Sequence, residues 1–102
     1  MTTQRKAFNA TEIVTHLTLL NGERAKSWRY LDGALDKQFE FKNFYETMAF
    51  VNAVAFIANQ QDHHPDLQVS YKACVVRYNS HDVQGISQRD FDCAARIDAL
   101  ST

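Results

Sequence analysis

The spacing of apolar residues changes abruptly at Asn43, and this change constrains the fold more than any other feature of the sequence. Residues 35–42 alternate, with Phe39 and Phe41 on the apolar side, and a period of two is typical of a half-buried strand. From 43 to 61, apolar residues recur at helical spacing on two flanks, which predicts a long helix buried on more than one side. The chain must therefore pack a sheet against a helix.

The other elements can be placed from capping and turn signals. Asn9 with Glu12 forms a capping-box pattern, Asp32-Gly33 is a hairpin signal, and Ser87 can cap a last helix. The predicted helices cover 9–21, 43–61 and 87–100, and the predicted strands cover 28–31, 35–42, 67–71 and 73–80. This order, αββαββα, predicts an α+β fold with an antiparallel sheet and helices packed on one face.

Length, charge and cysteine content exclude several classes of protein. We interpret residues 1–102 as a single domain, because a second domain would be too small to bury its own core. With 11 Lys and Arg against 12 Asp and Glu, the chain lacks the basic footprint of nucleic-acid binding. We expect no membrane segment, since no apolar run approaches about 20 residues, and no secretory signal in the first ten residues. Cys74 and Cys93 lack disulfide or zinc spacing, which favours a reduced, cytoplasmic setting.

Candidate reactive groups concentrate in Asp62-His63-His64-Pro65, directly after the long helix. Histidine titrates near pH ~6.5 when unperturbed, so it can give or take protons at neutral pH. If strands 67–71 and 73–80 form a hairpin centred near Lys72, the returning strand delivers His81 beside His64 and Pro65. Three imidazoles would then converge at one end of the sheet. The alternative interpretation is an exposed polar corner between helix and strand.

Asp90 has two interpretations. It is the third residue after Ser87 and can complete the cap of the last helix. It can also face the histidines across the preceding turn, where it would orient an imidazole or bind a polar substrate. Arg89 is expected to be a solvated charge unless it lines the same cleft, and His16, which has no partner motif, is expected at the surface.

A metal site built from the three clustered histidines and Asp90 is a third possibility. Adjacent histidines rarely point at the same ion, and the sequence contains neither an HxH nor an HExxH spacing. We therefore expect no metal ligands among these residues.

The whole set of residues resembles the pterin-4a-carbinolamine dehydratase family, also called the dimerisation cofactor family. The resemblance is strongest over 28–100, and the matching residues are Trp28, the run 37–44, Asp62-His63-His64-Pro65, Tyr71, Ser80-His81, Gly85 and 87–90. The family's α+β fold agrees with the predicted order of elements. One position departs from the family pattern: the family usually has an ionisable residue, often Glu, four positions before the first histidine, where this chain has Asn59.

The resemblance implies dehydration of 4a-hydroxytetrahydrobiopterin (pterin-4a-carbinolamine) to the quinonoid dihydropterin, a step in tetrahydrobiopterin recycling. The chemistry would be general acid–base catalysis, with no cofactor. His63 and His81 would form the principal acid/base pair, and His64 would bind and polarise the pterin. Further residues would shape the pocket or form hydrogen bonds with the pterin: Asp62, Pro65, Asn79, Ser80, Asp82 and Asp90.

The expected partners are the pterin substrate and further copies of this chain. Unpaired sheet edges and the apolar flanks of the long helix predict a homodimer or homotetramer. The resemblance also implies a functional link to an aromatic amino acid hydroxylase, whose oxidised pterin would be recycled. The alternative is a non-catalytic dimerisation cofactor or interaction protein, since family members can act in this way on a transcription factor.

Overall fold

A computed structural model of the chain describes residues 6–24 and 26–101. The elements are α1 (Ala10–Asn21), β1 (Arg29–Leu31), β2 (Ala34–Glu40), α2 (Phe44–Gln61), β3 (Asp66–Val69), β4 (Ala73–Tyr78), α3 (Gln88–Asp98) and the 3-10 helices η1 (His81–Val83) and η2 (Ala99–Ser101). The predicted αββαββα order is confirmed, and the 3-10 helices are additions to it. The expectation that no secretory signal is present falls partly on residues 1–5, outside the described residues. In the described part, no helix combines the length and apolarity needed to cross a membrane.

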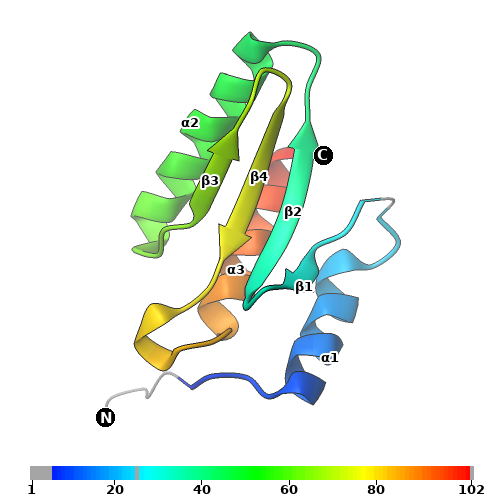
Figure 1. The fold of residues 1–102 in the computed structure, drawn as a ribbon, viewed down its shortest axis with the longest axis vertical. Coiled ribbons are helices and arrows are strands. Elements are labelled where there is room, and N and C mark those ends of the chain that lie inside the picture. The colour runs from blue at the N-terminus through cyan, green and yellow to red at the C-terminus, as the bar shows by residue number, and fades with distance from the viewer. Residues whose placement is uncertain (1–5, 25, 102) are drawn as a thin grey trace.

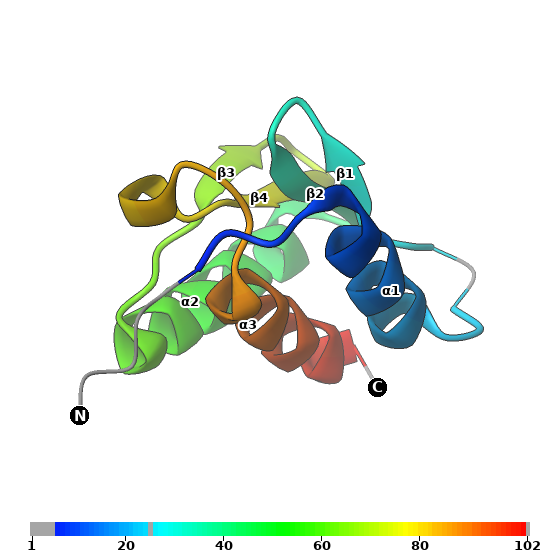
Figure 2. The same ribbon diagram turned by 90° about the horizontal axis from the view of Figure 1, so that it is seen from below.

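The strands form one antiparallel sheet in the order β1-β2-β4-β3. Helices α2 and α3 lie against one face of this sheet, and α1 lies near its β1 edge beside α3 (Figure 1). The view from below shows the sheet above and the helices beneath it (Figure 2). The predicted antiparallel sheet with helices on one face is therefore confirmed.

The β3–β4 hairpin decides where His81 lies. Val69 pairs with Cys74, so the turn spans 70–73 and agrees with the predicted centre near Lys72. The turn contains no Gly, Asn or Asp; instead both the backbone N–H and the hydroxyl of Ser70 donate to the Ala73 carbonyl, at 2.9 and 3.3 Å. The hairpin returns β4 alongside the segment that carries the paired histidines.

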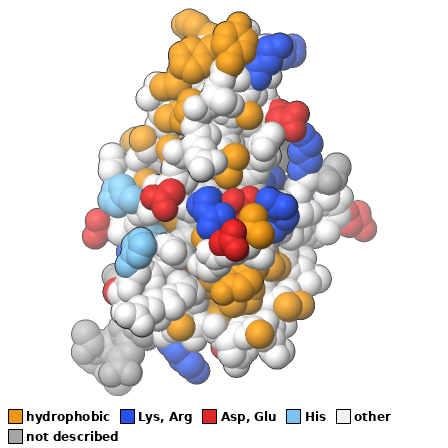
Figure 3. All heavy atoms as spheres, in the orientation of Figure 1, with side chains coloured by type: hydrophobic (Ala, Val, Ile, Leu, Met, Phe, Trp, Pro, Cys, Tyr) orange, Lys and Arg blue, Asp and Glu red, His pale blue; other side chains and the backbone are white. Residues whose placement is uncertain are grey.

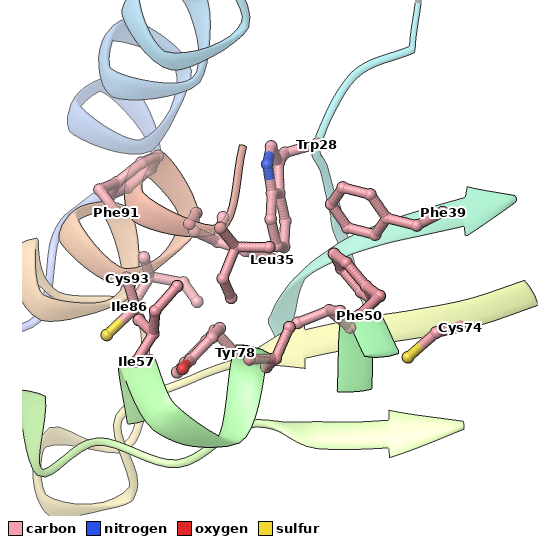
Figure 4. Packing of buried hydrophobic residues seen from close by; sticks show 14 of the residues in the cluster. Trp28, Leu35, Phe39, Phe50, Ile57, Cys74, Tyr78, Ile86, Phe91 and Cys93 are labelled. Carbon is pink, nitrogen blue, oxygen red and sulfur yellow. The ribbon is translucent and has the colours of Figure 1, made fainter. Parts of the chain in front are cut away.

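The hydrophobic core lies between the sheet and the two helices beneath it (Figure 4). Leu35, Val76 and Tyr78 enter it from the strands, Val54 from α2 and Ile97 from α3, and all five are fully buried. This core fixes the relative position of α2, β4 and α3, the elements that carry or flank the candidate site.

Two sequence predictions about burial are wrong for the single chain. The long helix α2 is buried on one side only, because Phe44 and Phe56 on its outer flank are 47% and 64% exposed. His16 is half-buried rather than at the surface. Its ring forms a triangle with those of Phe8 and Phe91, with centroid distances of 4.5 and 5.2 Å from His16, because the segment before α1 folds back over this region.

Lys37 is buried although it carries a charge, and α3 provides the reason. Its ammonium donates to Asp98 Oδ1 at 2.8 Å, and Trp28 Nε1 donates to the same oxygen at 3.0 Å. Asp98 is the last residue of α3 and is also buried. The lysine on the apolar side of β2 is therefore held by an ion pair between the sheet and the helix.

Candidate active site

The end of α2 sets the directions of the paired histidines. Asp62 adopts a left-handed backbone conformation with φ of 50°, which Asp tolerates better than most residues. The Asp62 N–H donates to the Asn59 carbonyl at 3.3 Å, and the His63 N–H donates to the Ala58 carbonyl at 3.1 Å. This ending closes the helix and reverses the chain. As a result, His63 is buried and His64 is exposed.

His63 is held by a carboxylate in the protein interior. Its Nε2 lies 2.5 Å from Asp90 Oδ1, and Asp90 is fully buried at the start of α3. An ionised carboxylate only accepts hydrogen bonds, so Nε2 carries the hydrogen. The other ring nitrogen, Nδ1, is then the position at which neutral His63 can accept a proton.

The Asp90 carboxylate holds two further groups besides His63. Its Oδ2 accepts from the Ser80 hydroxyl at 2.8 Å and from the Ser87 backbone N–H at 2.9 Å, and the two serine hydroxyls lie 2.7 Å apart. Asp90 therefore both completes the cap of α3 and faces a histidine, so the two interpretations drawn from the sequence hold together.

Tyr78 supports His63 from β4. Its hydroxyl donates to the His63 carbonyl at 3.1 Å, and its ring lies 5.2 Å from the imidazole, centroid to centroid. Burial raises the pKa of Tyr78 well above the ordinary value for a phenol, and the neighbouring Cys93 adds to this effect. The phenol therefore stays protonated and keeps donating throughout the neutral range.

His64 is held by the residue at which the sequence departs from the family pattern. Its Nε2 lies 3.1 Å from the side-chain oxygen of Asn59, one turn back on α2. The amide oxygen accepts, so the imidazole donates from Nε2 and leaves Nδ1 available. Asn59 can orient His64 in this way, but unlike Glu it adds no negative charge.

The three histidines line one cavity of about 350 Å³, together with Asp62, Asn79, Asp82 and Arg89. His63 and His64 come from the end of α2, and His81 opens η1. Within the described residues the His81 side chain has no hydrogen-bond partner. Histidine and acidic side chains gather at one side of the open face of the sheet (Figure 3). The volume is within the range of about 300 to 1,000 Å³ common for small-molecule sites.

The remaining predicted residues lie around this cavity rather than on its wall. Ser80 and Asp90 are buried behind His63, and Pro65 is half-buried where the chain enters β3. Arg89, which sequence analysis left open as a solvated charge, is on the wall, where it donates to the Asp62 carbonyl at 2.6 Å. The position of Arg89 directly before Asp90 in the sequence is the feature from which its place on the cavity wall could have been predicted. Among the described residues, no three His, Cys, Asp or Glu side chains are grouped to hold a metal ion.

Fold and site together define a class: a small α+β protein with a histidine-lined cavity at one end of its sheet. Residues 6–100 match the family model described as pterin 4 alpha carbinolamine dehydratase, and the chain belongs to this family.

Relatives and solved structures agree with this assignment. The chain is 58% identical over 99 residues to a protein of Paracidovorax citrulli, covering 94% of this chain and 82% of the relative. It is 48% identical over 100 residues to one of Bdellovibrio bacteriovorus, with coverage of 94% and 79%. Both carry the name "Putative pterin-4-alpha-carbinolamine dehydratase".

Two solved structures share the fold. A transcriptional coactivator/pterin dehydratase from Brucella melitensis matches with a TM-score of 0.85 and 25% identity over 95% of this chain and all of that one. A pterin dehydratase-like protein identified as a RuBisCO assembly factor in the alpha-carboxysome matches with a TM-score of 0.63 and 26% identity, over 74% of this chain and 89% of that one. The fold is thus found in proteins that are described as having different roles.

Proposed function

We propose that this protein dehydrates 4a-hydroxytetrahydropterins to quinonoid dihydropterins by histidine acid–base catalysis. The observation that supports this most directly is the His63–Asp90 pair at a cavity that also contains His64 and His81. A buried carboxylate bonded to one nitrogen of an imidazole fixes the orientation of the ring and leaves the other nitrogen for proton transfer. The same logic operates where a base is oriented by a third group.

The reaction needs one proton delivered and one removed. The C4a–O bond breaks as the hydroxyl takes a proton and leaves as water, and a ring nitrogen of the pterin gives up a proton as the new double bond forms. In our scheme His63 Nδ1 accepts the ring proton and protonated His81 supplies the proton to the hydroxyl. Exchange with water returns both imidazoles to their starting states, so the scheme uses protein side chains alone.

The other residues of the cavity bind and orient the substrate in this proposal. His64, oriented by Asn59, binds and polarises the pterin. Asp62, Asn79 and Asp82 provide hydrogen-bonding groups on the cavity wall. Pro65, Ser80 and Asp90 contribute indirectly: Pro65 restricts the backbone of His64, and Ser80 and Asp90 hold His63.

Dehydration of freshly generated 4a-hydroxytetrahydropterin, followed by absorbance against the spontaneous rate, tests the proposal. We expect His63→Ala and His81→Ala to lose about 10²- to 10⁴-fold in kcat/KM. His16→Gln is the matched control, because it removes a histidine outside the cavity. Wild-type activity in both cavity variants, with folding verified by circular dichroism, would contradict the assignment.

We further propose that the enzyme works as a cytoplasmic homodimer or homotetramer in tetrahydrobiopterin recycling, linked to an aromatic amino acid hydroxylase. The support for assembly is the exposed apolar flank of α2 and the open strand edges of β1 and β3. Light scattering at micromolar concentration checks the assembly, and a strict monomer would contradict it. The link is checked by adding the protein to an aromatic amino acid hydroxylase at limiting pterin concentration, where the rate of hydroxylation should rise.

A second candidate function is that of a non-catalytic interaction protein. Its support is that the two solved relatives are described as a transcriptional coactivator/pterin dehydratase and as an assembly factor. Exposed aromatic side chains on α2 add to this support: Phe44, Tyr45 and Phe56. The dehydration assay separates the two candidates, because an interaction protein would not exceed the spontaneous rate.

A further inference from the structure

A second cavity adjoins the histidine-lined cavity. It has a volume of about 450 Å³ and shares Asn79 and His81 with the first. Its other lining residues come from different parts of the chain: Tyr30 and Gly33 from the β1–β2 hairpin, and Ser80, Gln84 and Gly85 from the segment around η1. The two cavities therefore meet at the imidazole to which we assign proton delivery.

Apart from His81, the wall of this second cavity offers neutral hydrogen-bonding groups. Within the described residues, the hydroxyl of Tyr30 and the side-chain amides of Asn79 and Gln84 have no hydrogen-bond partner. Tyr30 is 51% exposed, and Gln84 is also exposed. No lysine or arginine lines the cavity among the described residues, so its chemistry suits a neutral hydroxylated group better than a phosphate or carboxylate.

Backbone hydrogen bonds hold the η1 side of this cavity in place. Gln84 has a left-handed conformation with φ of 53°, and its N–H donates to the His81 carbonyl at 3.2 Å. Ser80 and Gly85 form an antiparallel bridge, with N–O distances of 2.7 and 3.2 Å. The Phe8 N–H donates to the Ile86 carbonyl at 2.7 Å, which attaches the segment before α1 to the same loop. The cavity is thus built on a loop held at both ends.

The geometry of a pterin connects the two cavities. C4a, which carries the leaving hydroxyl, and C6, which carries the variable substituent, are both bonded to N5. A pterin whose C4a lies at His63 and His81 must therefore project its C6 substituent close to the same residues. The second cavity is the adjoining space on the Asn79–His81 side.

We infer that the second cavity receives the C6 substituent of the pterin and that Tyr30 and Gln84 bind hydroxyl groups on it. The inference rests on the proposed function for the position of the ring. It makes these two residues determinants of specificity, favouring a neutral polyhydroxyalkyl substituent such as dihydroxypropyl over methyl. Neither residue takes part in proton transfer.

The test compares two substrates in the wild type, Tyr30→Phe and Gln84→Ala: 4a-hydroxytetrahydrobiopterin and its 6-methyl analogue. Loss of one hydrogen bond should lower kcat/KM for the biopterin substrate about threefold to tenfold. The 6-methyl substrate should change less than twofold. Tyr45→Phe and Gln68→Ala, exposed residues outside both cavities, are the matched controls.

A binding measurement keeps the inference separate from the proposed reaction. Fluorescence titration with oxidised biopterin and with unsubstituted pterin reports the contribution of the substituent without turnover. A protein that does not catalyse dehydration, but binds biopterin more tightly than pterin and loses this preference in Tyr30→Phe and Gln84→Ala, would refute the proposed reaction. The same result would support the inference that the second cavity binds the substituent. Equal losses with both substrates, or an unchanged biopterin-to-pterin affinity ratio in both variants, would overturn the inference.

Discussion

Helix α3 carries a buried aspartate at each end, and the two differ in what surrounds them. Asp90, near its start, meets an imidazole, one serine hydroxyl and a backbone N–H. Asp98, at its end, meets the Lys37 ammonium and the Trp28 indole, while its Oδ2 is buried without a hydrogen-bond partner in the described structure. Arg24 approaches that oxygen at 3.6 Å from the partly exposed side.

The comparison separates a carboxylate that forms an ion pair between sheet and helix from one that holds a candidate catalytic imidazole. A lysine ammonium ordinarily acts as a fixed cation, which suits an ion pair that joins the sheet to a helix. Histidine changes its charge in the neutral range, and His63 also borders a cavity. Burial of a carboxylate therefore does not by itself indicate function. Better indicators are a partner side chain that can gain or lose a proton near neutral pH and a cavity that this partner borders.

The largest expected effect on stability is at the Asp98 end. Lys37→Met removes the buried cation that bonds to Asp98 and leaves only the partly exposed Arg24 near this carboxylate, so the free energy of unfolding should fall by about 3 kcal/mol. The rate of dehydration per folded molecule should not change. Chemical denaturation measures the first quantity, and the dehydration assay measures the second.

Two further variants test whether the Lys37–Asp98 pair is the cause of the expected loss of stability. Lys26→Met removes a lysine from an exposed pair with Glu40 and should change stability little. Lys37→Met combined with Asp98→Asn should recover part of the loss, because no unpaired charge remains in the interior. An unaltered unfolding free energy in Lys37→Met alone would show that the pair does not stabilise the fold.

At the Asp90 end the expected effect is on activity. Asp90→Asn retains a similar shape but removes the negative charge that holds His63, so kcat/KM for dehydration should fall on the order of 10²-fold. Asp92→Asn, on an exposed position of the same helix, is the control and should keep wild-type activity. Full activity in Asp90→Asn would mean that the two ends of α3 do not differ as proposed.

A smaller effect is expected one turn before His63. Asn59→Glu places a carboxylate beside His64 and favours its protonated form, since opposite charges attract. The pH–activity profile and the NMR titration of the His64 ring should therefore move to higher pH. Gln60→Glu adds the same charge at the next residue, which forms no hydrogen bond with His64 in the described structure, and should move them less. Superimposable curves for the wild type and Asn59→Glu would refute the coupling.

The smallest expected effect concerns the cysteines. Burial raises the pKa of both thiols, Cys74 and Cys93, so both stay protonated near neutral pH. Iodoacetamide at pH 7 should leave dehydration unchanged and should alkylate the thiols only after unfolding, as mass spectrometry would show. Rapid alkylation of the native protein with loss of activity would indicate a thiol in the reaction.

The α+β class and the order of its elements were predictable because the signals are local. Alternation in 35–42, helical spacing in 43–61 and the capping residues Asn9 and Ser87 each act within a few residues of the chain. The convergence of His63, His64 and His81 on one cavity was also predictable, since it needed only one hairpin between them. Their catalytic roles stay predictions.

Other features depended on contacts between distant parts of the chain. Lys37 could be recognised as a charge on the apolar side of a strand, but its partner Asp98 lies 61 residues later. His16 was placed at the surface because its partner rings, Phe8 and Phe91, come from the segment before α1 and from α3. The outer flank of α2 looked buried because periodicity shows that a flank is apolar but not whether another layer covers it.

The elements, their order and the candidate reactive side chains could be predicted from short segments of the chain, because backbone preference and side-chain chemistry are local properties. Three features required the folded chain: the nitrogen of His63 that is bonded to Asp90, the place of Arg89 on the cavity wall, and the second cavity that Tyr30 and Gln84 help to line beside His81. The physical reason is that hydrogen-bond geometry and cavity shape depend on ångström-scale distances between segments. Those distances are fixed by the packing of α2, α3 and the sheet around their common core.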